Sequence, residues 1–220
     1  MDGSTIAILG GTGQQGSGIA RRLAHAGGRL VIGSRDPARA RGAIASWPAP
    51  ANGLDAATYR DAIGAAAIVV LAVPFESLAD LLDTHRRDFT TGALLVDVTV
   101  PLIFSDRSIR MADVPEGSAA ESVKARARDD LRVAATFKTV PARLLHEVER
   151  PLDCDEFVCG DSPEARDGAM ALVRLLQGLR PVDVGPLSRA RAIEHVTLLA
   201  VAINRRHKIH SARFRVVGLA

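Results

Sequence analysis

The residues that carry the clearest chemical pattern lie at the beginning of the chain, where an apolar run breaks into glycines. The run Ile6–Leu9 leads into Gly10–Gly16, in which Gly11, Gly13 and Gly16 have the spacing of a dinucleotide-binding fingerprint. We expect Gly11 to permit the tight turn, Gly13 to let the backbone approach a pyrophosphate, and Gly16 to let the next helix pack closely. A helix that begins here directs its free N–H groups at the phosphates. The stretch predicts a dinucleotide site, and an ordinary glycine-rich turn is the alternative.

The end of the second predicted strand indicates which dinucleotide fits. An NAD site usually has an acidic residue here to bind the ribose 2′-hydroxyl, but this chain has Ser34 and Arg35, with Arg39 one helical turn later. A guanidinium offers a planar set of donors to a 2′-phosphate, and a hydroxyl adds another donor. Asp36 could be the missing acid, but its place before Pro37 favours a helix N-cap. The strand tip therefore predicts NADP.

Three further predicted strands end in a Val-Pro pair, namely Val73-Pro74, Val100-Pro101 and Val140-Pro141. Ligands of open α/β sheets bind beyond the carboxyl ends of the strands, near the point where the strand order reverses. We therefore expect these tips to form walls for the nicotinamide and for the molecule that reacts with it. The alternative is that each proline only terminates its strand.

The catalytic partners of the common dehydrogenases are not recognisable. Carbonyl reductases need a proton donor beside the substrate, yet the Tyr-x-x-x-Lys pair is absent, because Tyr59 is followed four residues later by Ile63. Lys124 is only a loose candidate for a helix-borne lysine, and no metal site or nucleophile–base pair is recognisable. These observations favour hydride transfer to an acceptor with its own electron sink, such as a flavin-like ring, while the protein aligns the two rings.

Composition excludes several classes of partner. Hydrophobic residues make up 47% and charged residues 24%, as in a soluble globular protein, and no apolar stretch is long enough to cross a bilayer. Aromatic residues are only 4% and the basic residues are scattered, so we expect small anionic coenzymes as partners and no nucleic acid. The first strand begins close to Met1, and Cys154 and Cys159 match no zinc or disulfide pattern. We expect a cytoplasmic protein with two buried thiols.

The alternation of strand and helix patterns indicates an α/β fold with a Rossmann-like, doubly wound, mostly parallel sheet. Shorter units near the end of the chain indicate a smaller C-terminal α/β segment that forms the substrate cleft. We therefore expect an NADP-binding domain at 1–143 and a substrate and dimerisation domain at 144–220.

Other features of the chain are also expected from local patterns. Residues 48–52 and 102–117 are predicted to be loops, and Arg21 and Arg22 are expected on the outer face of the first helix. A last helix beginning near Ser188 has an apolar stripe that indicates a homodimer face, with core packing as the alternative. Basic residues at its end either complement the helix dipole or bind an acidic ligand tail.

Several segments form a pattern through nearly the whole chain: Ile8–Gly13, Val31–Arg35, Val73-Pro74, Thr139–Ala142, Phe157–Asp161 and Gly178–Leu187. Together they resemble the F420-dependent NADP reductases, also called NADPH:coenzyme F420 oxidoreductases. The last segment is the most specific, because it has no general role in nucleotide binding. The resemblance implies reversible hydride transfer between NADP(H) and the central carbon of the deazaflavin coenzyme F420, without an essential acid or base.

The resemblance also implies the roles of individual residues. The NADP set comprises the 2′-phosphate ligands Thr12, Ser34, Arg35 and Arg39, the turn residues Gly10, Gly11, Gly13, Gln14, Gln15 and Gly16, and Val73, Pro74, Val98 and Ala142 towards the nicotinamide. The deazaflavin pocket is implied to contain Thr139, Val140 and Pro141. Lys138 departs from the family, whose members carry other polar residues there, including histidine.

Two other functions remain open at this point. The chain could be an NADPH-dependent reductase of another flavin, a quinone or a metal acceptor. It could also be a non-catalytic NADP-binding regulatory protein, although its second half resembles a substrate cleft more than an interaction tail.

Overall fold

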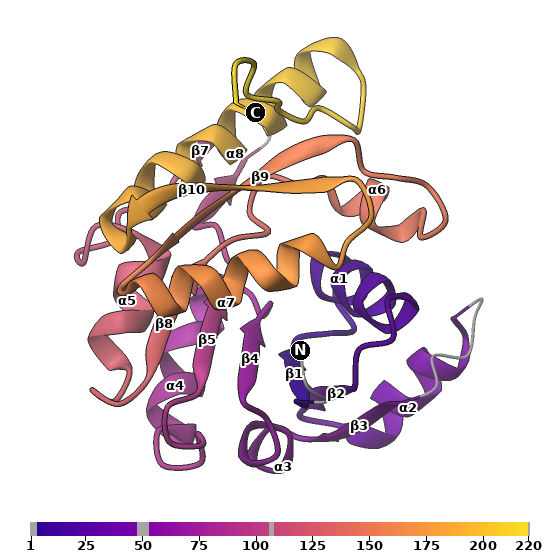
Figure 1. Cartoon of the computed structure of the whole chain (residues 1–220). Helices are drawn as coiled ribbons and strands as arrows, with labels where there is room; N and C mark the ends of the chain where they lie inside the picture. The colour runs from indigo at the N-terminus through magenta and orange to yellow at the C-terminus, as the bar shows by residue number, and fades with distance from the viewer. Residues whose placement is uncertain (1–3, 48–52, 106–107, 220) are drawn as a thin grey trace.

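A computed structural model describes residues 4–47, 53–105 and 108–219. Within these residues, eight strands form one sheet in the order β10-β9-β8-β5-β4-β1-β2-β3 (Figure 1). The strands are β1 (Ile6–Leu9), β2 (Leu30–Ser34), β3 (Leu54–Thr58), β4 (Ile68–Leu71), β5 (Leu94–Asp97), β8 (Arg132–Ala135), β9 (Cys154–Gly160) and β10 (Leu179–Pro186). Neighbouring strands are parallel except at β8 and β9, which pair antiparallel. The predicted α/β class with a doubly wound, mostly parallel sheet is confirmed.

Helices cover both faces of the sheet. They are α1 (Gln14–His25), α2 (Pro37–Ala45), α3 (Tyr59–Gly64), α4 (Leu78–His85), α5 (Ala119–Arg126), α6 (Ala142–His146), α7 (Pro163–Arg174) and α8 (Ala190–His207). Short 3₁₀ turns, η1 (Phe75–Ser77) and η2 (Leu187–Arg189), precede α4 and α8. Figure 1 shows α1 and α7 in front of the sheet and α4 and α5 behind it.

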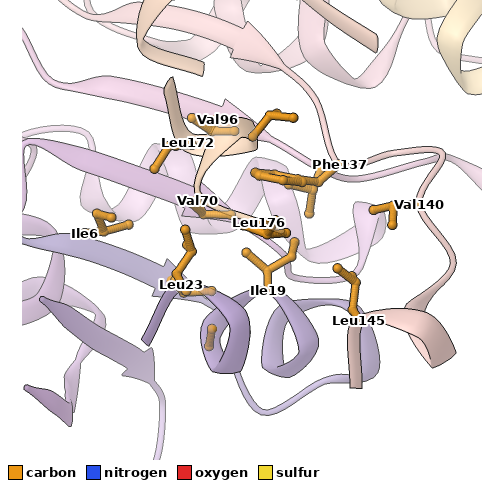
Figure 2. Packing of buried hydrophobic residues seen from close by; sticks show 14 of the residues in the cluster. Ile6, Ile19, Leu23, Val70, Val96, Phe137, Val140, Leu145, Leu172 and Leu176 are labelled. Carbon is orange, nitrogen blue, oxygen red and sulfur yellow. The ribbon is translucent and has the colours of Figure 1, made fainter. Parts of the chain in front are cut away.

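Alternating side chains of the strands supply two hydrophobic cores. Ile6 and Ile8 of β1 point into a cluster with α1, α6 and α7, whereas Ala7 and Leu9 point into a second cluster with α3, α4, α5 and α8. This alternation follows from the two-residue repeat of a strand, and it explains why both faces of the central strands are apolar. Figure 2 shows the first cluster, in which Ile19 and Leu23 of α1 lie beneath Val70.

The strand order reverses between β1 and β4, because β2 and β3 continue on one side of β1 and β4 begins the other side. The carboxyl ends of these two strands lie together, and the Ala72 N–H donates to the Leu9 carbonyl at 2.8 Å. In open α/β sheets this is the place where ligands bind. The glycine turn and the Val73-Pro74 tip therefore meet at the topological switch point.

The helix cap predicted at Asp36 is confirmed, and two serines cap other helices in the same way. The Asp36 carboxylate accepts the Arg39 N–H at 3.0 Å, with Pro37 in the first turn of α2. Ser118 accepts the Glu121 N–H at 3.1 Å at the start of α5, and Ser162 accepts the Ala165 N–H at 3.1 Å at the start of α7. A short side chain that satisfies a free amide of the first turn fixes where each helix begins.

Several expectations were wrong. Strand β3 and helix α6 were not expected, and the 102–117 connection contains a β-hairpin made of β6 (Leu102–Phe104) and β7 (Ile109–Met111). Arg22 is buried rather than exposed, because its guanidinium donates to four carbonyl groups, those of Leu144, Leu145, Glu147 and Arg150. The predicted loop at 48–52 lies outside the described residues.

The C-terminal strands join the same sheet as the N-terminal ones, since β9 pairs with β8 across residue 143. The division into 1–143 and 144–220 therefore stays a prediction about roles. No helix within the described ranges is long and apolar enough to cross a membrane. Cys154 and Cys159 are buried free thiols, as expected.

Candidate functional site: a dinucleotide cavity at the switch point

The glycine turn packs as closely as the fingerprint predicts, but Gly10 takes the role that was expected of Gly11. The residue with a left-handed backbone is Gly10, at φ 81°, and a methyl group there would lie 2.5 Å from the Ala72 carbonyl oxygen. Gly11 was expected to permit the turn, yet its missing side chain instead makes room for Ile32, since a methyl group on Gly11 would lie 2.6 Å from that side chain. Gly16 packs against the Gly10 carbonyl as predicted, since a methyl group there would lie 2.5 Å away.

Helix α1 begins directly after this turn and presents an uncapped N-terminus. Its N-cap residue, Gly13, has no side chain to satisfy the first-turn amides, and the first turn contains no acidic residue. The Gly13 N–H itself donates to the Gly10 carbonyl at 3.0 Å, which closes the turn. The free amides at the start of α1 and the helix dipole are the features that bind phosphate groups.

A cavity of about 420 Å³ opens beside the turn. It gathers residues from the turn after β1, from β2 and the segment that follows it, from α2 and α3, and from the segment after β4, namely Gly10, Thr12, Gly13, Gly33, Ser34, Arg35, Asp36, Arg39, Ala40, Ala43, Tyr59, Ala72, Val73 and Pro74. Eight of the predicted NADP residues are therefore brought together: Gly10, Thr12, Gly13, Ser34, Arg35, Arg39, Val73 and Pro74. Gly11, Gln14, Gln15, Gly16, Val98 and Ala142 do not line this cavity.

The charge of the cavity comes from two exposed arginines. Within the described residues, neither Arg35 nor Arg39 has a side-chain partner. The one acidic group beside them, Asp36, is engaged in capping α2. Ser34 makes a local turn, in which its hydroxyl donates to the Asp36 carbonyl at 3.0 Å and accepts the Asp36 N–H at 3.1 Å. The strand tip thus offers two unengaged guanidinium groups to an anionic ligand.

Tyr59 is a cavity residue that was not predicted to belong to the site. It begins α3, and burial raises the pKa of its phenol. Its ring packs edge-on against His85, with 5.8 Å between the ring centroids. In the sequence, Tyr59 stood out only as the single tyrosine. It was therefore considered as a proton donor and not as part of the wall of a coenzyme site.

The 137–141 segment, which follows β8, lies beside the glycine turn. Gln15, in the first turn of α1, donates its side-chain amide to the carbonyls of Phe137 at 2.7 Å and Val140 at 3.3 Å. Phe137 has a left-handed backbone, with φ 55°. Thr139 and Val140 are buried, whereas Pro141 is half-buried and forms the N-cap of α6. The predicted deazaflavin residues therefore adjoin the turn but stand outside the described cavity.

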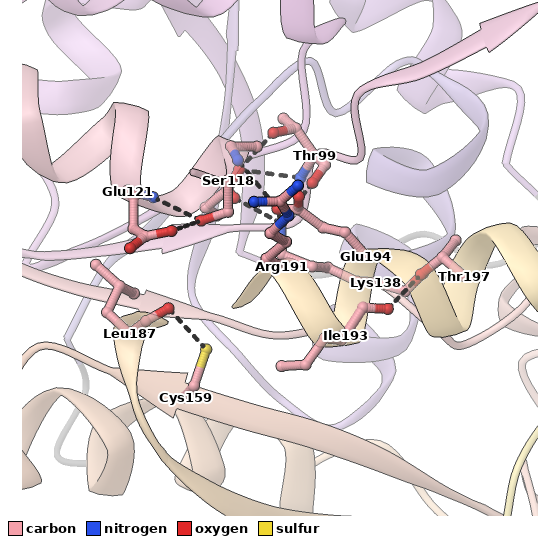
Figure 3. Close-up of polar contacts among 12 residues, drawn as sticks. Thr99, Ser118, Glu121, Lys138, Cys159, Leu187, Arg191, Ile193, Glu194 and Thr197 are labelled. Carbon is pink, nitrogen blue, oxygen red and sulfur yellow. Dashed lines mark hydrogen bonds and ion pairs between the residues drawn. The ribbon is translucent and has the colours of Figure 1, made fainter. Parts of the chain in front are cut away.

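A buried ionic cluster lies behind this segment, and sequence reasoning did not find it. The Lys138 ammonium donates to the Asp97 carboxylate at 2.6 Å, to Glu194 at 3.2 Å and to the Thr99 carbonyl. Figure 3 shows Lys138 together with Thr99 and Glu194. Burial by itself lowers the pKa of Lys138, but the two carboxylates outweigh it and raise that pKa above its ordinary value. The available signal was Asp97, a charge at the end of an otherwise apolar strand, and its partners are too distant in sequence to be paired by spacing.

The doubly wound sheet, the glycine turn and the cationic strand tip define a dinucleotide-binding protein of the Rossmann class. The family model described as "NADP oxidoreductase coenzyme F420-dependent" matches residues 5–101. The F420-dependent NADP reductase of Methanothermobacter thermautotrophicus is 37% identical over 97% of this chain and 95% of its own length. The chain belongs to the family of F420-dependent NADP reductases.

Two further comparisons extend this relationship. A crystal structure from Arthrobacter sp. FB24, whose assignment as an F420-dependent NADP reductase is provisional, superposes with a TM-score of 0.80 and 27% identity, covering 98% of this chain and all of that one. The human metalloreductase STEAP2 is 29% identical over 88% of this chain, which corresponds to only 36% of that protein.

Proposed function

We propose that the protein transfers a hydride reversibly between NADP(H) and the deazaflavin coenzyme F420. Two observations together support this proposal. The chain is related over nearly its full length to an F420-dependent NADP reductase, and its cavity joins the glycine turn to two arginines without side-chain partners within the described residues. NADPH supplies the hydride, and reduction of the deazaflavin also takes up one proton. The chain's own contribution is to bind both molecules and to align the two rings.

On the donor side, Thr12, Ser34, Arg35 and Arg39 bind the 2′-phosphate, and the backbone of Gly13, Gln14 and Gln15 faces the pyrophosphate. Gly10, Gly11 and Gly16 allow the close approach of turn and helix. Val73, Pro74, Val98 and Ala142 border the nicotinamide. These roles fit the uncapped N-terminus of α1 and the exposed guanidinium groups at the end of β2.

On the acceptor side, Thr139, Val140 and Pro141 contribute to the deazaflavin pocket. In this proposal the 1–143 part binds NADP, and the 144–220 part completes the acceptor cleft and the dimer contact. The bonds from Gln15 support the arrangement, because they hold the 137–141 segment beside the first turn of the helix that receives the phosphates.

The direct test mixes the purified protein with NADPH and F420 and follows the absorbance and fluorescence of the deazaflavin. We expect NADPH-dependent bleaching that reverses when NADP+ is added to reduced F420. A lack of bleaching across a range of pH would contradict the proposal. Turnover with another flavin, a quinone or a ferric complex alone would favour the broader reductase function, and tight NADPH binding without any turnover would favour a regulatory role.

We also propose a homodimer that works in the cytoplasm. Leu199 of α8 is 52% exposed and Phe104 of the neighbouring β6–β7 hairpin is 66% exposed. Large apolar side chains exposed on adjacent elements are typical of an interaction surface. The two free thiols fit a reducing compartment.

A further inference from the structure

The 137–141 segment is held from several sides, and one of its anchors is a carboxyl group. Glu156 lies on β9 with no exposed surface. Its Oε1 atom accepts the N–H groups of Lys138 at 2.9 Å and Thr139 at 3.2 Å, and its Oε2 atom accepts the Thr139 hydroxyl at 2.8 Å. Within the described residues, the 137–141 segment therefore supplies the hydrogen bonds that this carboxyl group accepts.

The side chains that share the face of β9 with Glu156 carry no charge. Side chains alternate along β9, so Glu156 shares a face with Cys154 and Val158, which belong to the core cluster beneath α1 and α7. The Cys154 thiol beside it is uncharged, because burial raises its pKa to about 12. From α1, the nearby Gln15 is a neutral donor to the segment, and from α8, Thr197 donates to the Lys138 carbonyl at 2.9 Å.

No cation pairs with Glu156 among the described residues. The ammonium of Lys138 is engaged by Asp97 and Glu194. On the strand next to β9, the Arg180 guanidinium binds Asp155 at 2.7 Å, and the nearby charge of the C-terminal tail, Arg213, acts on Cys154. A carboxylate buried without a cation is costly, whereas the neutral acid is not.

The neutral acid fits the observed geometry without rearrangement. Its Oε1 atom still accepts both N–H groups, and its Oε2–H can donate to the Thr139 hydroxyl oxygen, so that every polar atom keeps a partner. Burial raises the pKa of Glu156 to about 7, and the hydrogen bonds from Thr139, Lys138 and Val140 lower it only in part.

We propose that Glu156 is a positioning residue for the hydride acceptor: its neutral carboxyl group holds the 137–141 segment in place, and its ionisation loosens that segment. The role rests on the proposed function, in which Thr139, Val140 and Pro141 contact the deazaflavin. Ionisation favours a hydrated carboxylate, and lifting of the segment that donates its hydrogen bonds is the movement that would let water reach it.

The sign follows from linkage. Where the segment is closed, Glu156 titrates near pH 7, and where it is lifted, the carboxyl group titrates near its ordinary value of 4.5. Between these values the closed form binds more protons, so rising pH favours lifting by up to about tenfold per pH unit. Above pH 7 both forms are ionised, and the effect levels off.

Amide hydrogen exchange tests this inference without turnover. In the wild-type protein, and after correction for intrinsic exchange, we expect the protection of the Lys138 and Thr139 amides to fall by about a hundredfold between pH 5 and 7.5. In Glu156→Gln, which mimics the neutral acid, protection should be equal at both pH values. Glu121→Gln is the matched control, because it removes the same charge at the start of α5 and should behave as the wild type does.

Protection that does not change with pH in the wild type would overturn the proposal, even if the Gln variant failed to fold. Equal pH dependence in Glu156→Gln and the wild type would overturn it as well.

The KM for F420 tests whether loosening of the segment affects binding of the hydride acceptor. The ratio of the wild-type KM for F420 to that of Glu156→Gln should rise severalfold from pH 5.5 to 7.5, since the ionisation of F420 affects both proteins alike. A constant ratio alongside pH-dependent exchange would show that the loosening does not reach the acceptor, and would refute the positioning role. If F420 were not turned over at all, the proposed function would fail, while the exchange experiment would still decide whether Glu156 controls the segment.

Discussion

At the scale of single residues, Arg35 and Arg39 indicate an anion-binding site because their charges have no partner within the described residues. Both guanidinium groups are exposed at the end of β2, both line the 420 Å³ cavity, and within the described residues neither has a side-chain partner. Their acidic neighbour, Asp36, is committed to the N-terminus of α2. A charge held in a cavity without an internal partner is available to an anion.

Replacing Arg35 with Ala should raise the KM for NADPH by about 10- to 100-fold, the loss of one charge-assisted hydrogen-bonding group. The KM for NADH should change little, because NADH has no 2′-phosphate. Steady-state kinetics with both dinucleotides measure the difference. The matched control is Arg41→Ala on the same helix, because Arg41 pairs with Asp55 outside the cavity. Equal losses with NADH and NADPH would contradict the assigned role of Arg35.

Glu156 also predicts how global stability changes with pH. Its carboxyl pKa is about 7 in the folded protein against an ordinary value of 4.5 in the unfolded chain, so the folded state binds the proton more tightly. This group adds no pH dependence below pH 4.5, and it lowers the free energy of unfolding as pH rises from 4.5 to 7, by about 3 kcal/mol in total. Denaturant unfolding of the wild type and Glu156→Gln should diverge over that window. Parallel stability curves would refute this.

At the scale of elements, the Lys138 cluster adds a buried polar link between elements that the second hydrophobic core also packs together. Lys138 follows β8, Asp97 ends β5, and Glu194 lies on α8 and also accepts the Ala119 N–H at the start of α5 at 3.1 Å. One ammonium group thereby fixes two strands and two helices around the segment that precedes α6.

Lys138→Met should therefore destabilise the fold by about 3–5 kcal/mol, because it leaves two buried carboxylates without their cation. Chemical denaturation near pH 7 measures the loss. Lys124→Met is the matched control. Lys124 pairs with Asp161 at 2.7 Å but is 40% exposed, so its removal should cost less than about 1 kcal/mol. Similar losses of unfolding free energy in the two variants would show that the buried ion pairs stabilise the fold no more than the exposed pair does.

At the scale of the whole molecule, the accuracy of the sequence predictions depended on how local each signal was. The glycine turn and the caps at Asp36, Ser118 and Ser162 were predictable, because each is set by residues three or four positions apart. Strand β3 was missed because its residues, Leu-Asp-Ala-Ala-Thr, have weak strand propensity and are held by pairing with β2. Lys138 and Glu156 were missed because their partners come from other elements, which spacing along the chain cannot reveal.

The quaternary structure gives a prediction at the same scale. Leu199 and Phe104 are exposed on α8 and the adjacent hairpin, so Leu199→Asp should place a charge within the proposed homodimer contact and shift the protein towards monomer. Light scattering over a dilution series measures the mass. Ala65→Asp, at the exposed end of α3, is the control and should leave the mass unchanged. A wild-type protein that is monomeric at every concentration would contradict the dimer.

Helix α1 contacts both halves of the proposed reaction site. Its first turn is proposed to bind the pyrophosphate, while Gln15 in that turn binds the Phe137 and Val140 carbonyls and Arg22 binds the Leu144 carbonyl of α6. In the proposed function, ordering of this helix by one coenzyme would alter the free energy of binding the other. Such cooperativity is reciprocal. If NADP+ changes the dissociation constant of the deazaflavin by some factor, the deazaflavin changes the dissociation constant of NADP+ by the same factor. The order in which the two coenzymes bind and leave would then be governed by a helix that reacts with neither.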